Sequence, residues 1–200
     1  MDPYLIITIT ILFSAFFSGT EIAFVSANKL KIELDKKKGK LSARIVANLG
    51  KTPSRFIGAL LLGNNIALVI YGIAMARIME AGIKNILPPG LESEFSILLI
   101  QTILSTLLIL ITAEFLPKII FRINPNRILQ IISPLLSIIY YLLFPFMLLF
   151  IGLSEFILKR ILNIPIQNDS YKFSSVDFDD YIREISGEAQ EENDIQQEIQ

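Results

Sequence analysis

The sequence predicts an all-α, polytopic membrane protein with three transmembrane helices, and three observations support this fold class. Of the 200 residues, 52% are hydrophobic and only 18% are charged, which is too apolar for an ordinary water-soluble domain. The apolar residues gather in uncharged runs close to the ~20 residues that a helix needs to cross a bilayer. The formal net charge of -1 hides a basic cluster at residues 29–55 and an acidic segment at residues 169–200. We therefore expect a lipid bilayer as partner, and no nucleic acid.

The first predicted span covers residues 3–25. Its first part is free of charge, and apolar residues continue to Val25. No basic residue precedes the span and no small-residue cleavage site is evident, so we expect no cleaved signal peptide. Seven Lys and Arg residues follow between positions 29 and 44. Because basic residues concentrate in cytoplasmic loops, the N-terminus is predicted to lie outside the cell.

The second and third predicted spans cover about residues 56–79 and 95–117. The loop between them contains Pro88-Pro89-Gly90 and is poor in basic residues, as an outside loop should be. Basic residues return between positions 118 and 127, on the cytoplasmic side of the third span. The pattern predicts a multi-pass protein of the plasma membrane with its C-terminus in the cytoplasm.

A further apolar segment, at about residues 128–158, is predicted to be a juxtamembrane helix. Its uncharged part is too short for two crossings of a ~30 Å hydrocarbon core, which need about 40 residues. One crossing would put the acidic segment outside, against the distribution of basic residues though not excluded by it. We favour a helix that bends at Pro134 and Pro145, lies against the inner leaflet and leaves on the same side.

The chain changes composition after a membrane domain at residues 1–165. Residues 169–200 hold ten Asp and Glu against two Lys and Arg. The spacing of Phe178, Ile182 and Ile185 predicts a helix, so residues 166–200 are interpreted as an acidic helical bundle or connector in the cytosol. Its carboxylates either concentrate cations or simply keep a connector in solution, and both interpretations stay open.

Polar residues inside the spans are the candidate functional groups, because an ionisable group at membrane depth costs roughly 2.5–3.5 kcal/mol on insertion scales. They are Ser14, Ser18 and Glu21 in the first span, Asn64 and Asn65 in the second, and Thr112, Glu114 and Lys118 in the third, with Gly19, Gly63 and Pro117 beside them. Ser14, Ser18 and Glu21 fall at i, i+4 and i+7, which puts them on one helical face. Hydroxyl, amide and carboxylate oxygens form a ligand set suited to Mg²⁺, Ca²⁺, Mn²⁺ or Na⁺. Pro117 also frees a backbone carbonyl, that of Ala113.

Two structural alternatives remain beside an ion site. The serine and threonine hydroxyls are able to bond back to carbonyls of their own helices. Glu21 or Glu114 is able to pair with Lys118 or with other basic residues that snorkel to the interface. The chain has no His and no Cys, and no paired Asp in the spans, so we expect no intramembrane protease and no other enzyme.

Three short motifs resemble, in order, the signatures of the transmembrane domain of the CNNM/CorC family of magnesium transporters, hemolysin-like membrane proteins that contain CBS domains. They are FFSGTEIA at residues 16–23, LLGNN at residues 61–65 and EFLPK at residues 114–118. The resemblance covers essentially the whole chain. One departure is Ala113, where the family commonly has Gly.

The resemblance implies a homodimer with three spans in each subunit, a pair of cytosolic helices after the first span and a juxtamembrane helix that forms a belt. It implies that the acidic connector leads to a cytosolic CBS-domain pair that binds ATP, which lies beyond residue 200. No ATP site is therefore expected in this chain. The implied activity is Mg²⁺ export coupled to Na⁺ entry by alternating access. The alternative is a membrane-anchored Mg²⁺ sensor or scaffold that regulates another transporter.

The resemblance also implies the ligands of a dehydrated Mg²⁺ between the spans. These are Ser18, Asn65 and Glu114, with Asn64 as an additional candidate. Supporting roles fall to Gly19, Glu21, Gly63, Pro117 and Lys118, and Pro117 is expected to distort the third span so that it presents backbone oxygen.

Overall fold

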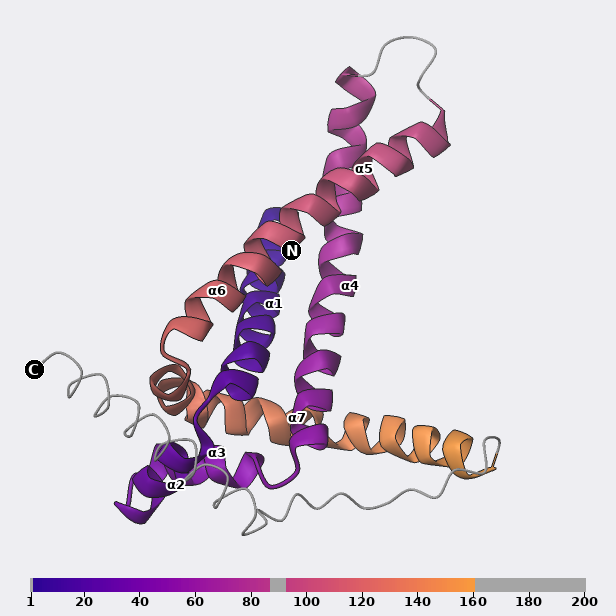
Figure 1. Cartoon of the computed structure of the whole chain (residues 1–200). Helices are drawn as coiled ribbons and strands as arrows, with labels where there is room; N and C mark the ends of the chain where they lie inside the picture. The colour runs from indigo at the N-terminus through magenta and orange to yellow at the C-terminus, as the bar shows by residue number, and fades with distance from the viewer. Residues whose placement is uncertain (1, 87–92, 161–200) are drawn as a thin grey trace, which may run out of the picture. The chain divides into compact units, whose positions relative to one another are not determined.

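The computed structural model describes residues 2–86 and 93–160, which form helices and short turns without strands (Figure 1). The chain divides into two compact units, residues 1–166 and 167–200. The second unit lies outside the described residues, and so do the predicted acidic bundle and the Pro88-Pro89-Gly90 turn. In the described residues of the first unit, the all-helical architecture agrees with the predicted fold class.

Helix α1 spans Pro3–Ser26. Asp2 caps its start by accepting a hydrogen bond from the Tyr4 amide at 3.1 Å, and a proline at the first helical position has no amide to leave unpaired. Its 24 residues give a length of about 36 Å, enough to cross a bilayer. The helix covers the predicted first span.

A pair of short helices follows, α2 at Lys29–Lys37 and α3 at Leu41–Leu49. Asn28 caps α2 by accepting from the Lys31 amide at 2.9 Å. Gly39 turns the chain between them at a φ of 83°, a backbone conformation that glycine adopts without steric cost. The helical pair implied by the family resemblance is therefore present in the fold.

The next two long helical segments run antiparallel to each other. Helix α4 spans Pro53–Ile86. The returning segment consists of α5 at Glu94–Ile109, a π-helix η1 at Leu110–Phe115 and α6 at Leu116–Ile123. The predicted spans at residues 56–79 and 95–117 fall inside these segments, which extend further at their ends.

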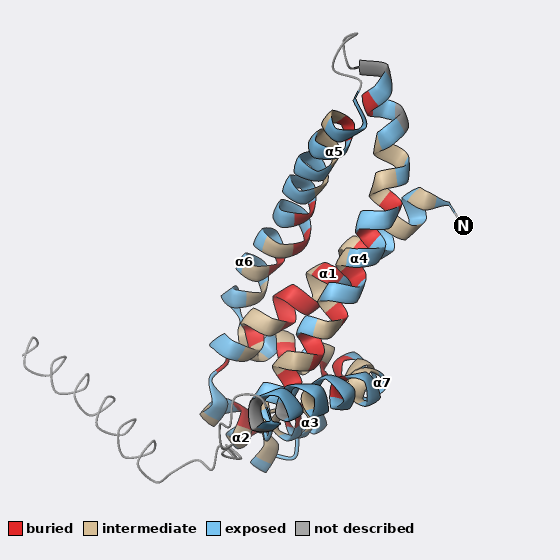
Figure 2. Ribbon diagram, turned by 90° about the vertical axis from the view of Figure 1, so that its right-hand side faces the viewer, coloured by how far each residue is buried: buried red, intermediate tan, exposed pale blue. Residues whose placement is uncertain are grey.

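Helix α7 spans Pro125–Arg160 without a break, although Pro134 and Pro145 lie inside it. It runs across the ends of α1 and α4 that lie nearest α2 and α3 in Figure 1, and it is seen nearly end-on in Figure 2. Four helical segments are long and apolar enough to cross a membrane, α1, α4, the α5–α6 segment and α7. By length and composition, α7 is thus a fourth candidate beside the three predicted spans.

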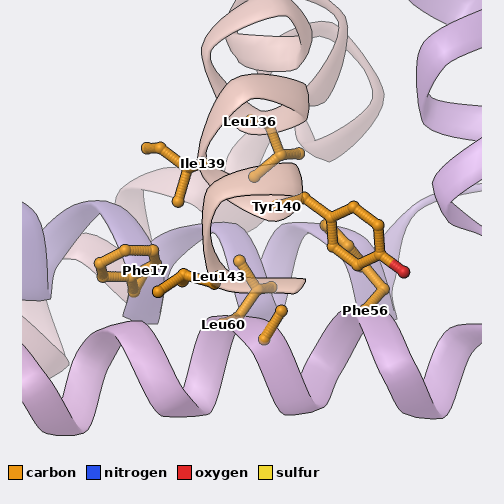
Figure 3. Close-up of a pocket in the computed structure, with 8 residues that line it drawn as sticks. Phe17, Phe56, Leu60, Leu136, Ile139, Tyr140 and Leu143 are labelled. Carbon is orange, nitrogen blue, oxygen red and sulfur yellow. The ribbon is translucent and has the colours of Figure 1, made fainter. Parts of the chain in front are cut away.

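The main hydrophobic core lies where α7 packs on α1, α3 and α4, and its buried residues are red in Figure 2. Figure 3 shows Phe17, Phe56 and Leu60 facing residues of α7. The crevice between the two sets is apolar and has no room for a water molecule. The first half of α7 is therefore a packed part of the fold and not a loosely attached segment.

Polar contacts also attach the beginning of α7 to α2. Asn126 accepts from the Asn28 amide at 3.0 Å and donates to the Asn28 carbonyl at 2.9 Å. One turn later, Gln130 donates to Asp35 at 2.8 Å, and Lys40 forms an ion pair with the same carboxylate at 2.7 Å. These contacts place the start of α7 and the α2–α3 pair at the same end of the helix bundle.

Candidate cation site

A hydrogen bond between Ser14 and Asn64 joins the first and second predicted spans. The Ser14 hydroxyl donates to the Asn64 side-chain oxygen at 2.6 Å. Ser14 is fully buried, and Asn64 is half-buried. Ser14 lies halfway along α1, so this polar contact falls near the centre of an apolar helix, where substrate sites of membrane transporters commonly lie.

Ser18 lies one turn further along the same buried face of α1. The residue is 2% exposed, and its hydroxyl oxygen has no hydrogen-bond partner in the part of the chain that the structure describes. A buried polar atom without a partner is costly, and such an atom calls for an explanation such as a bound ion or water. Service of the Ser18 hydroxyl oxygen as a cation ligand is one such explanation.

The two adjacent asparagines face in different directions. Consecutive residues of a helix project about 100° apart, so Asn64 and Asn65 do not both face α1. Asn64 contacts Ser14, whereas Asn65 lies at an exposed position of α4. Of the two amides in the LLGNN motif, the structure therefore brings Asn64 to the serines of α1.

The third motif lies alongside the same part of α1. Ala113 is fully buried and packs in a cluster that includes Ala15, while the Phe121 ring covers Gly19. The segment between Ala113 and Phe121, which carries Glu114 and Pro117, therefore runs beside Ala15–Gly19. All three motifs thus meet at the middle of α1.

The backbone is irregular where this third motif begins. The π-helix η1 ends at Phe115, and the Leu116 amide bonds to the Ile111 carbonyl five residues earlier. Pro117 follows directly and has no amide hydrogen to continue the helical pattern. Wide turns of this kind often occur at functional sites, and the expectation that Pro117 makes this span present backbone oxygen stays a prediction. Glu114 lies inside the π-helix and is half-buried.

The two glycines of the motifs allow close approach of aromatic rings. A Cβ atom added to Gly19 would lie 2.7 Å from the Phe121 ring. A Cβ atom added to Gly63 would clash with the ring of Phe17. At both positions an added Cβ atom would lie closer to a ring than ordinary carbon contacts allow. The supporting role expected of these glycines therefore has a steric basis.

The structural alternatives have different outcomes. The Thr112 hydroxyl donates to the Leu108 carbonyl of its own helix at 2.7 Å, as the alternative for hydroxyl groups predicts. Glu21, Glu114 and Lys118 are half-buried, and within residues 2–86 and 93–160 no ion pair joins either glutamate to Lys118. The alternative in which these charges satisfy each other is therefore not seen in this part of the chain.

The oxygen donors that the structure brings together at this place are uncharged, and Glu114 lies in the η1 segment that runs beside them. Among the described residues, no three Asp, Glu, His or Cys side chains are placed to hold a metal ion together. A cation here would depend on hydroxyl and amide oxygens, on backbone carbonyls and on Glu114. Such ligands fit a hard cation and do not fit the softer transition metals.

Sequence reasoning missed three features of this site. It grouped Ser14 with Ser18 on one helical face but did not identify Asn64 as the partner of Ser14. It also did not identify Phe17 and Phe121 as the rings that cover the glycines. The available signals were the i, i+4 spacing of the serines and the position of Pro117, and neither shows which face of α4 meets α1.

The chain is similar in sequence to several known proteins. Residues 5–198 match the family described as the Cyclin M transmembrane N-terminal domain, CNNM. The chain is 27% identical over 146 residues to the UPF0053 inner membrane protein YfjD of Escherichia coli, covering 73% of this chain and 32% of that protein. It is 26% identical over 162 residues to the UPF0053 protein sll0260 of Synechocystis, covering 79% and 36% respectively.

The chain is also 28% identical over 136 residues to the UPF0053 protein MG146 homolog of Mycoplasma pneumoniae, covering 66% of this chain and 30% of that protein. The chain thus spans about a third of the length of these curated relatives. The match to the family extends over nearly all of its residues, and its apolar helices are those of a multi-pass membrane protein. The chain belongs to the CNNM family.

Proposed function

We propose that this chain is the membrane domain of a magnesium transporter, in which Mg²⁺ binds between α1, α4 and the η1–α6 segment. The observation that carries the proposal is the buried Ser18 hydroxyl without a described partner, one turn from the Ser14–Asn64 pair. Mg²⁺ loses its water reluctantly and prefers six oxygens at short distance, so a closely packed oxygen site is needed to hold it.

The proposed ligands are Ser18, Asn64 and Glu114. Ser18 offers a free hydroxyl oxygen, Asn64 an amide oxygen, and Glu114 the negative charge that offsets part of the cation's desolvation. Asn65, a ligand implied by the family resemblance, is a secondary candidate because its position on α4 is exposed. Comparing variants of the two asparagines therefore tests the geometry directly.

The proposed topology has three spans, with α7 lying along the inner leaflet as a belt. Its support is the course of α7 across the ends of α1 and α4, together with the contacts that hold its start to α2. The N-terminus lies outside and α2 and α3 lie in the cytoplasm, because the basic residues follow α1. Two such chains form a homodimer in the plasma membrane, and a CBS-domain pair follows in the whole protein.

The proposed mechanism is alternating access around the Ser18–Asn64–Glu114 site. The π-helix η1 and Pro117 form a point where the third span can change its backbone pairing without breaking a regular helix. Releasing Mg²⁺ outward against an interior-negative potential costs ~2.3 kcal/mol per charge per 100 mV. Coupling export to Na⁺ entry supplies that free energy.

The test of the site is Mg²⁺-dependent thermal stability of the purified chain. We expect Mg²⁺ to raise the unfolding temperature of the wild type, and this increase to be lost in Asn64→Ala and Glu114→Gln. A Thr112→Val variant is the control, because that hydroxyl bonds within its own helix, and it should keep the increase. Asn65→Ala is measured beside them. Equal increases in all five proteins would contradict the site, and loss in Asn65→Ala and Glu114→Gln but not in Asn64→Ala would assign the amide ligand to Asn65.

Mg²⁺ flux in liposomes tests the activity itself. We expect flux from the whole protein that depends on a Na⁺ gradient and is abolished by Glu114→Gln. Absence of flux from a protein that Mg²⁺ still stabilises would favour a membrane-anchored Mg²⁺ sensor. The two measurements thus separate binding from transport.

A further inference from the structure

The end of the bundle that carries α2 and α3 exposes basic side chains that have no partner within residues 2–86 and 93–160. These residues, which we call the inner basic surface, are Lys31, Lys37, Arg44, Lys51, Arg55, Arg122 and Arg127. None of their side chains forms a hydrogen bond or ion pair with a described residue, whereas other lysines in this region do. Positive charge is therefore available here for a ligand outside the described chain.

The acidic side chains at the α2–α3 end of the bundle already have partners. Glu33 forms an ion pair with Lys36 at 2.9 Å, and Asp35 pairs with Lys40 at 2.7 Å and accepts from Gln130. These two are the only acidic residues in residues 27–55 and 116–130 of the sequence. The inner basic surface is thus uncompensated by acidic side chains of those segments.

Several of these cations lie at the boundary of the apolar zone. Arg55 lies in the first turn of α4, Arg122 in the last turn of α6, and Arg127 in the first turn of α7. Apolar side chains next to them, such as Ile123 and Ile131, are about 70% exposed. Charged heads beside exposed apolar side chains are typical of a position at a membrane–water interface.

The exposed apolar residues continue along one face of α7. Ile131, Leu135, Ile138 and Leu142 are all exposed and recur at helical spacing. Leu129 and Leu136, on the opposite face, are buried in the core. The outward face of α7 therefore has the character of a surface that contacts acyl chains.

We propose that the inner basic surface binds the phosphate groups of anionic phospholipids, whose acyl chains lie along the outward face of α7. Arg matches phosphate oxygens with two parallel hydrogen bonds, and Lys adds point charge. Clusters of basic residues next to a membrane helix are attracted by the negative potential of the cytoplasmic leaflet. An anionic lipid supplies both a phosphate for the basic side chains and acyl chains for the apolar face of α7. An acidic protein segment supplies only the negative charge.

The proposal predicts selectivity for lipid headgroups in the intact chain. The purified protein is titrated with phosphatidylglycerol or phosphatidylcholine of the same acyl chains, and bound lipids are counted by native mass spectrometry. We expect phosphatidylglycerol to bind more tightly, with a preference that falls as salt concentration rises because salt screens exposed charges. Equal binding of the two lipids at low salt would overturn the proposal.

Matched double variants locate the binding surface. Arg44→Gln with Arg55→Gln should lower the preference for phosphatidylglycerol about tenfold or more, from the usual contribution of each basic residue near a charged leaflet. Arg77→Gln with Lys84→Gln removes the same charge further along α4, and should leave the preference unchanged. Equal losses in both variants would contradict the proposed location, and thermal unfolding in phosphatidylcholine shows whether each variant is folded.

Two soluble probes distinguish other sources of the same attraction. Inorganic phosphate should fail to displace phosphatidylglycerol at equal concentration, because it lacks acyl chains. Polyglutamate represents an acidic protein partner. Displacement of phosphatidylglycerol by either probe at equal concentration would overturn the lipid assignment, in favour of a simple anion site or a protein partner respectively. None of these outcomes depends on Mg²⁺ transport.

Discussion

Gly63 and Gly19 are positions at which one added methyl group would change how closely the membrane helices pack. The Phe17 ring lies against Gly63, and Phe17 is itself buried beside Phe16, with ring centroids 5.6 Å apart. The Phe121 ring lies against Gly19 through the ring atoms nearest its own backbone, which have the least freedom to move. Small residues commonly serve this purpose where membrane helices meet.

We therefore predict that Gly63→Ala and Gly19→Ala each lower the free energy of unfolding by about 1–3 kcal/mol, the usual cost of overfilling a packed interior. Gly72→Ala is the matched control on α4, because an added Cβ there meets no atom within 4 Å. It should be neutral or stabilise by up to about 1 kcal/mol, since alanine favours helix over glycine. Thermal unfolding in detergent measures all three.

A second-site change sharpens this prediction. Phe17→Leu shortens the side chain that Gly63 accommodates, so it should restore part of the stability lost in Gly63→Ala. If Gly63→Ala and Gly72→Ala behave alike, or if Phe17→Leu only adds a further loss, steric contact with the ring is not the reason for glycine at this position.

At this scale the sequence located the polar residues but not all of their partners. The i, i+4 spacing correctly predicted that Ser14 and Ser18 share a face of α1, because helical geometry is local. The bond between Ser14 and Asn64 spans 50 residues and depends on the rotation of α4 about its own axis. Two adjacent asparagines carry no signal of that rotation, since it is decided by packing along the whole interface.

At the scale of elements, Asp35 links α2 to α7 and to the turn before α3. Lys40 and Gln130 both donate to this carboxylate and hold its pKa below the usual value of 3.8. A carboxyl group whose pKa is lower in the folded state stabilises the fold above its unfolded pKa. That stabilisation is lost as the pH falls through the folded value.

We predict that wild type exceeds Asp35→Asn in thermal stability by a constant margin from pH 7 to about pH 5. The margin should begin to shrink as the pH falls below about 4, where the carboxyl group of the unfolded chain takes up a proton, and its charge-dependent part should be lost below the lowered pKa of the folded state. Glu33→Gln is the control on the same helix, because its pair with Lys36 is partly exposed to solvent and such pairs contribute little. A margin that stays unchanged at low pH would show that the charge of Asp35 does not stabilise the contacts of α2 with α7 and with the turn before α3.

The elements themselves were largely predictable, because apolar length, caps and breakers act over a few residues. Asp2 caps α1, which begins at residue 3 as the sequence predicts, whereas the cap of α2 at Asn28 and the turn at Gly39 were not predicted. The bends expected at Pro134 and Pro145 do not interrupt α7, which is one helix from Pro125 to Arg160. Tolerance of an internal proline depends on neighbouring contacts in the fold, which the sequence pattern does not reveal.

At the scale of the whole molecule, the number of membrane crossings depends on α7. Its apolar length alone qualifies it as a candidate span. Its course across the ends of α1 and α4, and its attachment to α2 through Asn126 and Gln130, favour a position along one leaflet. The two arrangements place the end of α7 on opposite sides of the membrane.

Single cysteines can distinguish them, because the chain has no native Cys. We predict that Glu94→Cys, at the start of α5, reacts with a membrane-impermeant maleimide in intact cells. Lys38→Cys, beside the turn between α2 and α3, and Arg160→Cys, at the end of α7, should react only after the membrane is made permeable. All three positions are exposed, so accessibility within the protein does not bias the comparison. Reaction of Arg160→Cys in intact cells would show that α7 crosses the membrane, and the belt arrangement would then be wrong.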